Sequence, residues 1–281
     1  MDEIKSAASD ESILIARALK GEASAIESLV RKCQDQVYNL ALRFLWHPED
    51  AEDATQEIMI RAITRLSTFR GESAFTTWVY RIAANHLINM KKSRMERREV
   101  SFESVGRELA SVQPDFTAEF QNAELAGQVK VACTHAMLMC LDRDARIAFT
   151  LGVVFETTSE DAATILGITR EAYRKRLSRA RETMQDFLGQ NCGLMNTKAP
   201  CQCRFGVKPC MENKSIEPYV NLIASLKLEG QFALRQEQFS EEIADTERLA
   251  AIYRDRAEFP APPAILRRIQ SLLISGPVFQ N

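Results

Sequence analysis

The stretch 158–181, TSEDAATILGITREAYRKRLSRAR, decides the fold. Thr158 or Ser159 can cap a short helix that ends just before Gly167, since hydroxyl side chains accept hydrogen bonds from the first turn. Gly167 permits the left-handed backbone of a tight turn, and Thr169 can cap a second helix. Two helices joined by so short a turn have the spacing of a helix-turn-helix.

The second helix of this unit is strongly basic. Its basic residues are Arg170, Arg174, Lys175, Arg176, Arg179 and Arg181. The second helix of a helix-turn-helix can enter the major groove of DNA, where Arg and Lys donate hydrogen bonds to guanine edges. A basic helix face is often only solvated, so the pattern alone leaves DNA binding and a plain solvated surface both open.

The composition is that of a folded helical protein. The chain has 281 residues, 46% of them hydrophobic and 26% charged, which excludes a disordered chain. No apolar run reaches the ~18 residues that span a bilayer, and the polar N-terminus does not resemble a signal peptide. We therefore expect a cytoplasmic protein without a membrane partner. The net charge of −2 neither supports nor opposes nucleic-acid binding, so that prediction depends on how the charges are distributed along the chain.

The first hundred residues have helical periodicity. Apolar residues from Ile26 to Phe44 recur at steps of three and four. Pro48 is placed to begin another helix, because proline is tolerated in a first helical turn. One arc of this helix is acidic or polar and includes Glu49, Asp50, Glu52, Asp53, Gln56 and Glu57. This arc faces either a partner or water.

A third helix follows a turn at residues 69–72, and we expect Ser73 to cap it. Its outer side carries Arg81 and Asn85, and we expect the helix to continue into a basic run. That run contains Lys91, Lys92, Arg94, Arg97 and Arg98. Aromatic, basic and amide side chains together can stack on and read unpaired bases. Trp78 lies in the apolar stripe, where a core position is the common alternative to a base platform.

An acidic segment separates the two basic regions. Residues 99–124 are rich in Asp and Glu, and Gly106 and Pro114 oppose a long helix, so we expect a flexible linker. Two basic helical surfaces on either side of a linker indicate two separate contacts with nucleic acid.

Four of the seven cysteines fall close together after the helix-turn-helix. Cys192, Cys201, Cys203 and Cys210 have the spacing C-x8-C-x-C-x6-C. In a reducing compartment this pattern favours metal or redox chemistry over a structural disulfide. Four thiolates suit Zn²⁺, and Cu⁺ or Cd²⁺ would fit as well. A redox-switched thiol cluster and inert cysteines remain open. The other three, Cys33, Cys133 and Cys140, are expected in the core.

Two parts of the chain resemble the extracytoplasmic-function (ECF) sigma factors of the sigma-70 family. The first comprises DAEDATQE at residues 50–57 and FRGESAFTTWVYRIAAN at residues 69–85, and the second is the helix-turn-helix with RLSRAR at residues 176–181. In the family's order they cover about residues 12–188. The resemblance implies an all-α initiation factor that is not an enzyme. Such a factor binds core RNA polymerase, recognises minus-35 and minus-10 promoter DNA and initiates transcription.

The resemblance also implies domains and site residues. The domains are 12–98 for polymerase and minus-10 DNA, 99–124 as linker, 125–188 for minus-35 DNA, and 189–281 as a Cys-rich, helical C-terminal extension. Core polymerase would contact Asp50, Glu52, Asp53, Gln56 and Glu57. Minus-10 DNA would contact Phe69, Arg70, Trp78, Tyr80, Arg81, Asn85, Lys91 and Lys92. Minus-35 DNA would contact Arg170, Arg174, Lys175, Arg176, Ser178, Arg179 and Arg181.

Two departures from the family pattern matter. Glu171, Ala172, Tyr173 and Lys175 differ from the usual start of the recognition helix, so no promoter sequence is implied. The family also commonly ends after the helix-turn-helix, whereas this chain continues to residue 281. Some ECF factors carry metal-sensing cysteine-rich tails, which this extension resembles in kind, so we expect it to regulate the protein.

The helical tail at 212–281 leaves several roles open. Its last helix is expected after Pro263, with Ile265, Leu266 and Ile269 on one side. The tail could dock on the sigma domains in place of a separate anti-sigma factor, contact polymerase, or only stabilise the cysteine segment. The alternative for the whole chain is a helix-turn-helix repressor with a metal- or redox-sensing tail. An enzyme is disfavoured, since the sequence has no phosphate-binding glycine loop, H-E-x-x-H or hydrolase elbow.

Overall fold

The computed structural model describes residues 2–111, 123–203, 244–254 and 259–275. Within these ranges the regular elements are helical, apart from an isolated bridge between Cys192 and Cys201. The predicted all-α class is therefore confirmed. None of the helices in the described ranges is both long enough and apolar enough to cross a membrane.

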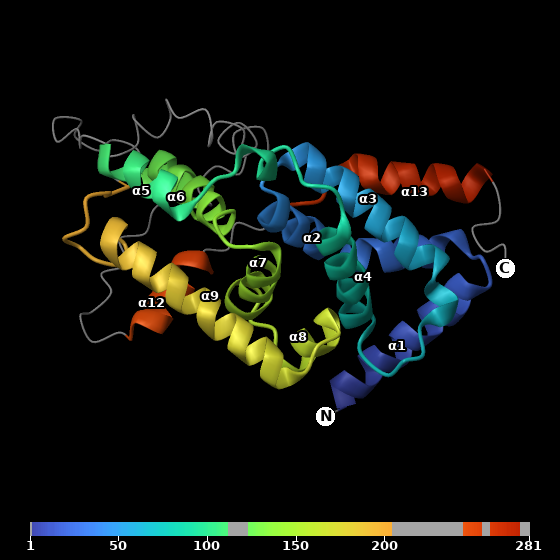
Figure 1. The fold of residues 1–281 in the computed structure, drawn as a ribbon. Coiled ribbons are helices and arrows are strands. Elements are labelled where there is room, and N and C mark those ends of the chain that lie inside the picture. The colour runs from blue at the N-terminus through green and yellow to red at the C-terminus, as the bar shows by residue number, and fades with distance from the viewer. Residues whose placement is uncertain (1, 112–122, 204–243, 255–258, 276–281) are drawn as a thin grey trace.

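The N-terminal group of helices packs around one central helix (Figure 1). Its elements are α1 (Asp2–Leu19), α2 (Ala23–Leu45), α3 (Pro48–Thr64), the short η1 (Leu66–Thr68) and α4 (Phe75–Asn89). Helix α2 contacts the other three α-helices and buries one long apolar face. The chain leaves α2 through Trp46, whose φ of 48° is left-handed. His47 then caps α3, since its Nδ1 accepts a hydrogen bond from the Asp50 N–H at 3.4 Å.

Both ends of α4 differ from the sequence prediction. The N-cap residue is Ala74, and the Ser73 hydroxyl bonds to the Ala74 carbonyl instead of capping the helix. The helix ends at Asn89, because the backbone of the next residue, Met90, is extended. It therefore does not continue into the basic run. The chain then turns back towards α3, because Asp50 accepts a hydrogen bond from the backbone N–H of Arg94 at 3.0 Å. Only a short 3-10 turn, η2 (Glu96–Arg98), follows.

The second group of helices contains the helix-turn-helix. Its elements are α6 (Ala123–Leu138), α7 (Arg143–Phe149), the π-helical turn η3 (Thr150–Val154), α8 (Ser159–Leu166) and α9 (Arg170–Asn191). Thr158 caps α8 and Thr169 caps α9, each through a 3.1 Å hydrogen bond from a backbone N–H. Gly167 ends α8 with a φ of 65°. The predicted helix-turn-helix is therefore present.

Part of the expected flexible linker is a helix. Helix α5 (Phe102–Ser111) packs against α9, and the rings of Phe102 and Phe187 lie 4.9 Å apart. The Ser101 hydroxyl also caps this helix, since it accepts a hydrogen bond from the Ser104 N–H at 3.1 Å, so local capping and tertiary packing both stabilise it. Pro114 lies outside the described residues.

The C-terminal extension contacts both groups of helices. Helix α12 (Asp245–Tyr253) packs on α9 and η3, whereas α13 (Pro263–Ser275) lies along α2 and α3 (Figure 1). The predicted last helix is present, with Ile265 and Ile269 buried.

The two groups also pack directly against each other. Helix α8 contacts α4 and α9, so the first helix of the helix-turn-helix lies between α4 and the basic second helix (Figure 1). Tyr80 of α4 contacts Phe155 with ring centroids 6.0 Å apart. The described residues therefore form one packed arrangement.

Candidate nucleic-acid and polymerase interface

The acidic face of α3 is only partly available to a partner. Asp53 and Glu57 are exposed, and the Glu57 carboxylate accepts a hydrogen bond from Arg61, which lowers its pKa. Asp50, by contrast, is held by Arg94, whose Nε lies 3.4 Å from the Asp50 carboxylate.

Two other side chains of this face are half-buried. The amide of Gln56 donates to the Glu52 carboxylate at 3.3 Å. The exposed acidic surface of α3 is therefore centred on Asp53 and Glu57.

A groove of about 410 Å³ runs between α3, η1 and α4. Side chains that can meet a phosphate or a base line it, namely Arg61, Arg65, Trp78, Arg81, Asn85 and His86. The structure thus brings together Trp78, Arg81 and Asn85, as the sequence predicted. It adds Arg61, Arg65 and His86, which the sequence analysis missed. Arg61 and Arg65 stand one helical turn apart at the end of α3, and that spacing was the available signal.

Trp78 combines the two roles that the sequence left open. Its ring packs on Phe69 at 5.5 Å and on Phe75 at 5.8 Å, while the residue stays half-exposed at the groove. Phe69 is also half-buried and contacts Phe75 at 5.7 Å. Phe69 and Phe75 therefore pack behind Trp78, which is the member of this aromatic cluster that lines the groove.

Other predicted minus-10 residues lie away from this groove. Tyr80 packs against Phe155. Lys91 and Lys92 are exposed beyond the end of α4, and Arg70 is exposed in the turn before it.

The groove itself contains His86, whose pKa is lowered by burial although the charge of Glu57 opposes this shift. A neutral His86 can both donate and accept hydrogen bonds.

The basic face of α9 is open to solvent. Its exposed members are Arg170, Arg174, Lys175, Ser178 and Arg179. Tyr173 and Leu177 are buried on the opposite side. Arg176 instead pairs with Asp144 of α7 at 3.1 Å, and Arg181 is half-buried. The exposed basic surface of α9 therefore consists of the first group of residues, without Arg176 and Arg181.

Two of the clustered cysteines meet in the structure. Cys192 and Cys201 are buried, and their segments pair through a 2.7 Å hydrogen bond from the Gly193 N–H to the Cys201 carbonyl. Burial raises the pKa of Cys192. Cys203 is half-exposed, whereas Cys210 lies outside the described residues.

The described ranges hold no group of three or more side chains arranged to bind a metal, so the metal stays a hypothesis. Burial raises the pKa of Cys33 and Cys140 to about 12, which suits packed thiols, and Cys133 is half-buried.

The fold is that of a helical protein with a helix-turn-helix and two separate basic surfaces, an arrangement typical of proteins that bind DNA. The Sigma-70 region 2 family matches residues 29–97, and the Sigma-70, region 4 family matches residues 132–184. The chain is 32% identical to the RNA polymerase sigma-H factor of Pseudomonas aeruginosa over 62% of this chain and 92% of that protein. It is 30% identical to the ECF RNA polymerase sigma-E factor of Escherichia coli over 63% and 93% respectively.

A solved structure, the sigma factor RpoE in complex with the anti-sigma factor NepR from Bartonella quintana, covers 61% of this chain and 97% of that chain, with 20% identity and a TM-score of 0.37. On the sequence matches, the protein belongs to the ECF sigma factors of the sigma-70 family. The second matched segment includes α8 and the first two thirds of α9.

Proposed function

We propose that this sigma factor binds core RNA polymerase through the exposed part of α3 and carries it to promoters. One observation supports the proposal most strongly: the groove with Trp78, Arg81 and Asn85 adjoins the acidic helix, while the basic face of α9 is exposed elsewhere. Opposite charges on a polymerase surface would be attracted to Asp53 and Glu57.

The groove suits unpaired DNA bases, and the basic face of α9 suits duplex DNA. The groove offers an aromatic edge, guanidinium groups and an amide, which can hold an unstacked base and its phosphates. Unstacking costs a few kcal/mol, so a fitted pocket has to offset that energy. The exposed α9 face suits a duplex major groove at the minus-35 element.

We propose further that the C-terminal extension regulates this activity in place of, or beside, a separate anti-sigma factor. Helix α13 lies on α3, the helix that carries the polymerase-binding residues. Cys192, Cys201, Cys203 and Cys210 would bind Zn²⁺, or Cu⁺ or Cd²⁺, and so connect the extension to a metal signal. Buried Cys192 and Cys201 on paired segments support this arrangement.

The polymerase contact is tested by charge reversal. Asp53→Lys should weaken binding to purified core polymerase by about tenfold or more, because it replaces an attraction by a repulsion. Glu103→Lys, an exposed change on α5, is the matched control and should bind as the unaltered protein does. Equal binding by both variants would refute the assignment of α3.

The cysteine cluster is tested separately. Replacing Cys201 and Cys203 by Ser should change transcription in vitro without abolishing polymerase binding. Unchanged transcription across chelator, added Zn²⁺ and oxidant would refute regulation by these thiols.

A further inference from the structure

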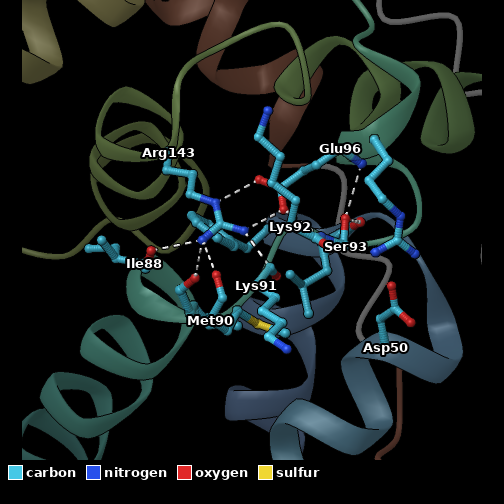
Figure 2. Close-up of polar contacts among 12 residues, drawn as sticks. Asp50, Ile88, Met90, Lys91, Lys92, Ser93, Glu96 and Arg143 are labelled. Atoms are coloured by element: carbon cyan, nitrogen blue, oxygen red, sulfur yellow. Dashed lines mark hydrogen bonds and ion pairs between the residues drawn. The ribbon is translucent and has the colours of Figure 1, made fainter.

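A polar joint connects the two groups of helices at the end of α4. Arg143, the first residue of α7, donates from Nη1 to the carbonyls of Ile88 at 2.8 Å and Met90 at 2.6 Å (Figure 2). The Ile88 carbonyl belongs to the last turn of α4 and Met90 is its C-cap residue, and a helix leaves acceptors unpaired at this end and favours positive charge there. Arg143 thus caps a helix of the other group.

Glu96 completes the contact from the N-terminal side. Arg143 donates two hydrogen bonds to the Glu96 carboxylate, from Nε at 2.8 Å and from Nη2 at 2.6 Å (Figure 2). Such forked pairs are among the stronger and more directional ion pairs. The backbone N–H of Ser93 holds the same carboxylate at 2.8 Å, which fixes it on its own side of the joint.

Arg146, one helical turn further along α7, is the third member. It reaches the Glu96 carboxylate at 3.2 Å and the carbonyl of Phe44 in α2 at 2.7 Å. The Glu96 side chain is 6% exposed and that of Arg146 is 4% exposed. We call Glu96, Arg143 and Arg146 the interdomain joint.

Such a joint specifies an arrangement more than it adds stability. Taking three charges out of water carries a large desolvation cost, which good geometry only offsets. Once formed, however, the joint penalises any displacement that separates its members, because a buried charge would lose its partner. It therefore favours one docked position of α7 over nearby ones.

The docked position cannot span a promoter. Helix α8 contacts both α4 and α9, and packed helices lie 8–10 Å apart, so the axes of α4 and α9 are at most about 20 Å apart where they flank α8. Elements centred near positions minus-35 and minus-10 are about 25 base pairs apart, or about 85 Å at 3.4 Å per base pair. The two groups must separate before both elements can be bound at once.

The segment between the groups is long enough to allow this. Residues 99–124 can extend to about 85 Å at 3.3 Å per residue. Part of that segment, α5, is held on α9 in the docked state. The extension also bridges the groups, because Arg254 pairs with Glu156 at 3.0 Å while α13 lies on α2 and α3.

We propose that the interdomain joint is a latch that keeps this sigma factor in a closed state, and that polymerase binding requires the latch to open. The inference rests on the proposed sigma function for its biological meaning. The closed state and its latch can be tested without polymerase, so the failure of one is distinguishable from the failure of the other.

The test uses Arg143→Met in the full chain and also in an Asn39→Ala background. Asn39 of α2 holds the extension, because its amide donates to the Phe259 carbonyl at 2.8 Å and accepts from the Phe259 N–H at 3.0 Å, so Asn39→Ala loosens it. A closed chain of this length has a radius of gyration of about 19 Å. We expect Arg143→Met to increase the radius measured by small-angle X-ray scattering by about a quarter in at least the loosened background. Arg17→Met, which breaks an Arg–Glu pair within the N-terminal group, is the matched control and should leave the radius unchanged.

Two further measurements separate a latch from a structural brace. Helical content by circular dichroism should stay the same, since each group keeps its own core. Affinity for core polymerase should rise about tenfold, because a protein that is already open no longer has to leave the closed state first.

Glu96→Gln removes the joint's only carboxylate from the other side and should act in the same direction. An unchanged radius in both backgrounds, or a larger radius with lower polymerase affinity, would overturn the proposal.

Discussion

Asn39→Ala should release the C-terminal helix from the N-terminal group. Asn39 is 4% exposed and pairs with the backbone of Phe259 in both directions, donating at 2.8 Å and accepting at 3.0 Å. Alanine removes both bonds, and a removed partner of a buried polar group costs about 1–3 kcal/mol. We expect the docking of residues 259–275 to weaken by about 2–4 kcal/mol. At 1.4 kcal/mol per tenfold change, this corresponds to about thirty- to thousandfold.

Hydrogen exchange measures this release directly. Amides of α13 should exchange faster in Asn39→Ala by that factor, up to the limit set by a fully detached helix, while those of α9 keep their protection. Gln36→Ala, an exposed change on the same helix, is the control and should leave α13 protected. If α13 exchanges at the same rate in both variants, the Asn39–Phe259 pairing does not anchor the extension. A simultaneous loss of protection in α9 would instead indicate general unfolding, which a thermal melt detects.

Three further results are expected. Gly152→Ala should destabilise the helix-turn-helix by about 1–3 kcal/mol in a denaturant titration, because the new Cβ would lie 2.7 Å from Leu177 and meet the Tyr173 hydroxyl; an unchanged midpoint would contradict that packing. Burial raises the pKa of Glu96, but hydrogen bonds from Arg143 and Ser93 and the charge of Arg146 outweigh it and hold the pKa at about 2, against 4.5 when unfolded. Because the folded pKa is depressed, the stability that comes from ionising Glu96 is complete above about pH 4.5 and is lost as the pH falls towards 2. Lys92, Glu99 and Asp142 also line this region, so the acid transition should be compared with that of Glu96→Gln, which should lack this component. Arg81→Ala should reduce promoter opening, measured by permanganate reactivity of unpaired thymines, without reducing polymerase binding.

The local parts of the fold were readable from the sequence. Thr158, Gly167 and Thr169 act within one helical turn, so the helix-turn-helix follows from neighbouring residues. Pro48 likewise marks the start of α3. The end of α4 at Asn89 could not be predicted from the sequence, because it depends on a hydrogen bond from the Arg94 N–H to Asp50, which lies 44 residues earlier.

Long-range packing explains the other differences. Helix α5 has a serine cap at Ser101 and packs Phe102 on Phe187, and the weight given to its acidic residues and Gly106 hid these signals. The interdomain joint depends on Glu96 meeting two arginines about fifty residues later in the chain.

Predicting the whole groove also required long-range contacts that the sequence does not show. Trp78, Arg81 and Asn85 lie on one helix and could be grouped from the sequence. Arg61 lies in α3 and Arg65 directly after it, and only the folded structure places them beside α4. The cysteine set stays a prediction, since Cys210 lies outside the described residues.

Transcription in vitro tests the central claim most directly. The purified protein would be combined with core RNA polymerase and a genomic promoter library, with and without chelator. We expect promoter-specific transcripts that depend on the protein, with a chelator effect if the cysteine cluster binds a metal. The absence of transcripts in both arms, together with tight binding to duplex DNA without polymerase, would contradict the sigma function and favour a helix-turn-helix repressor.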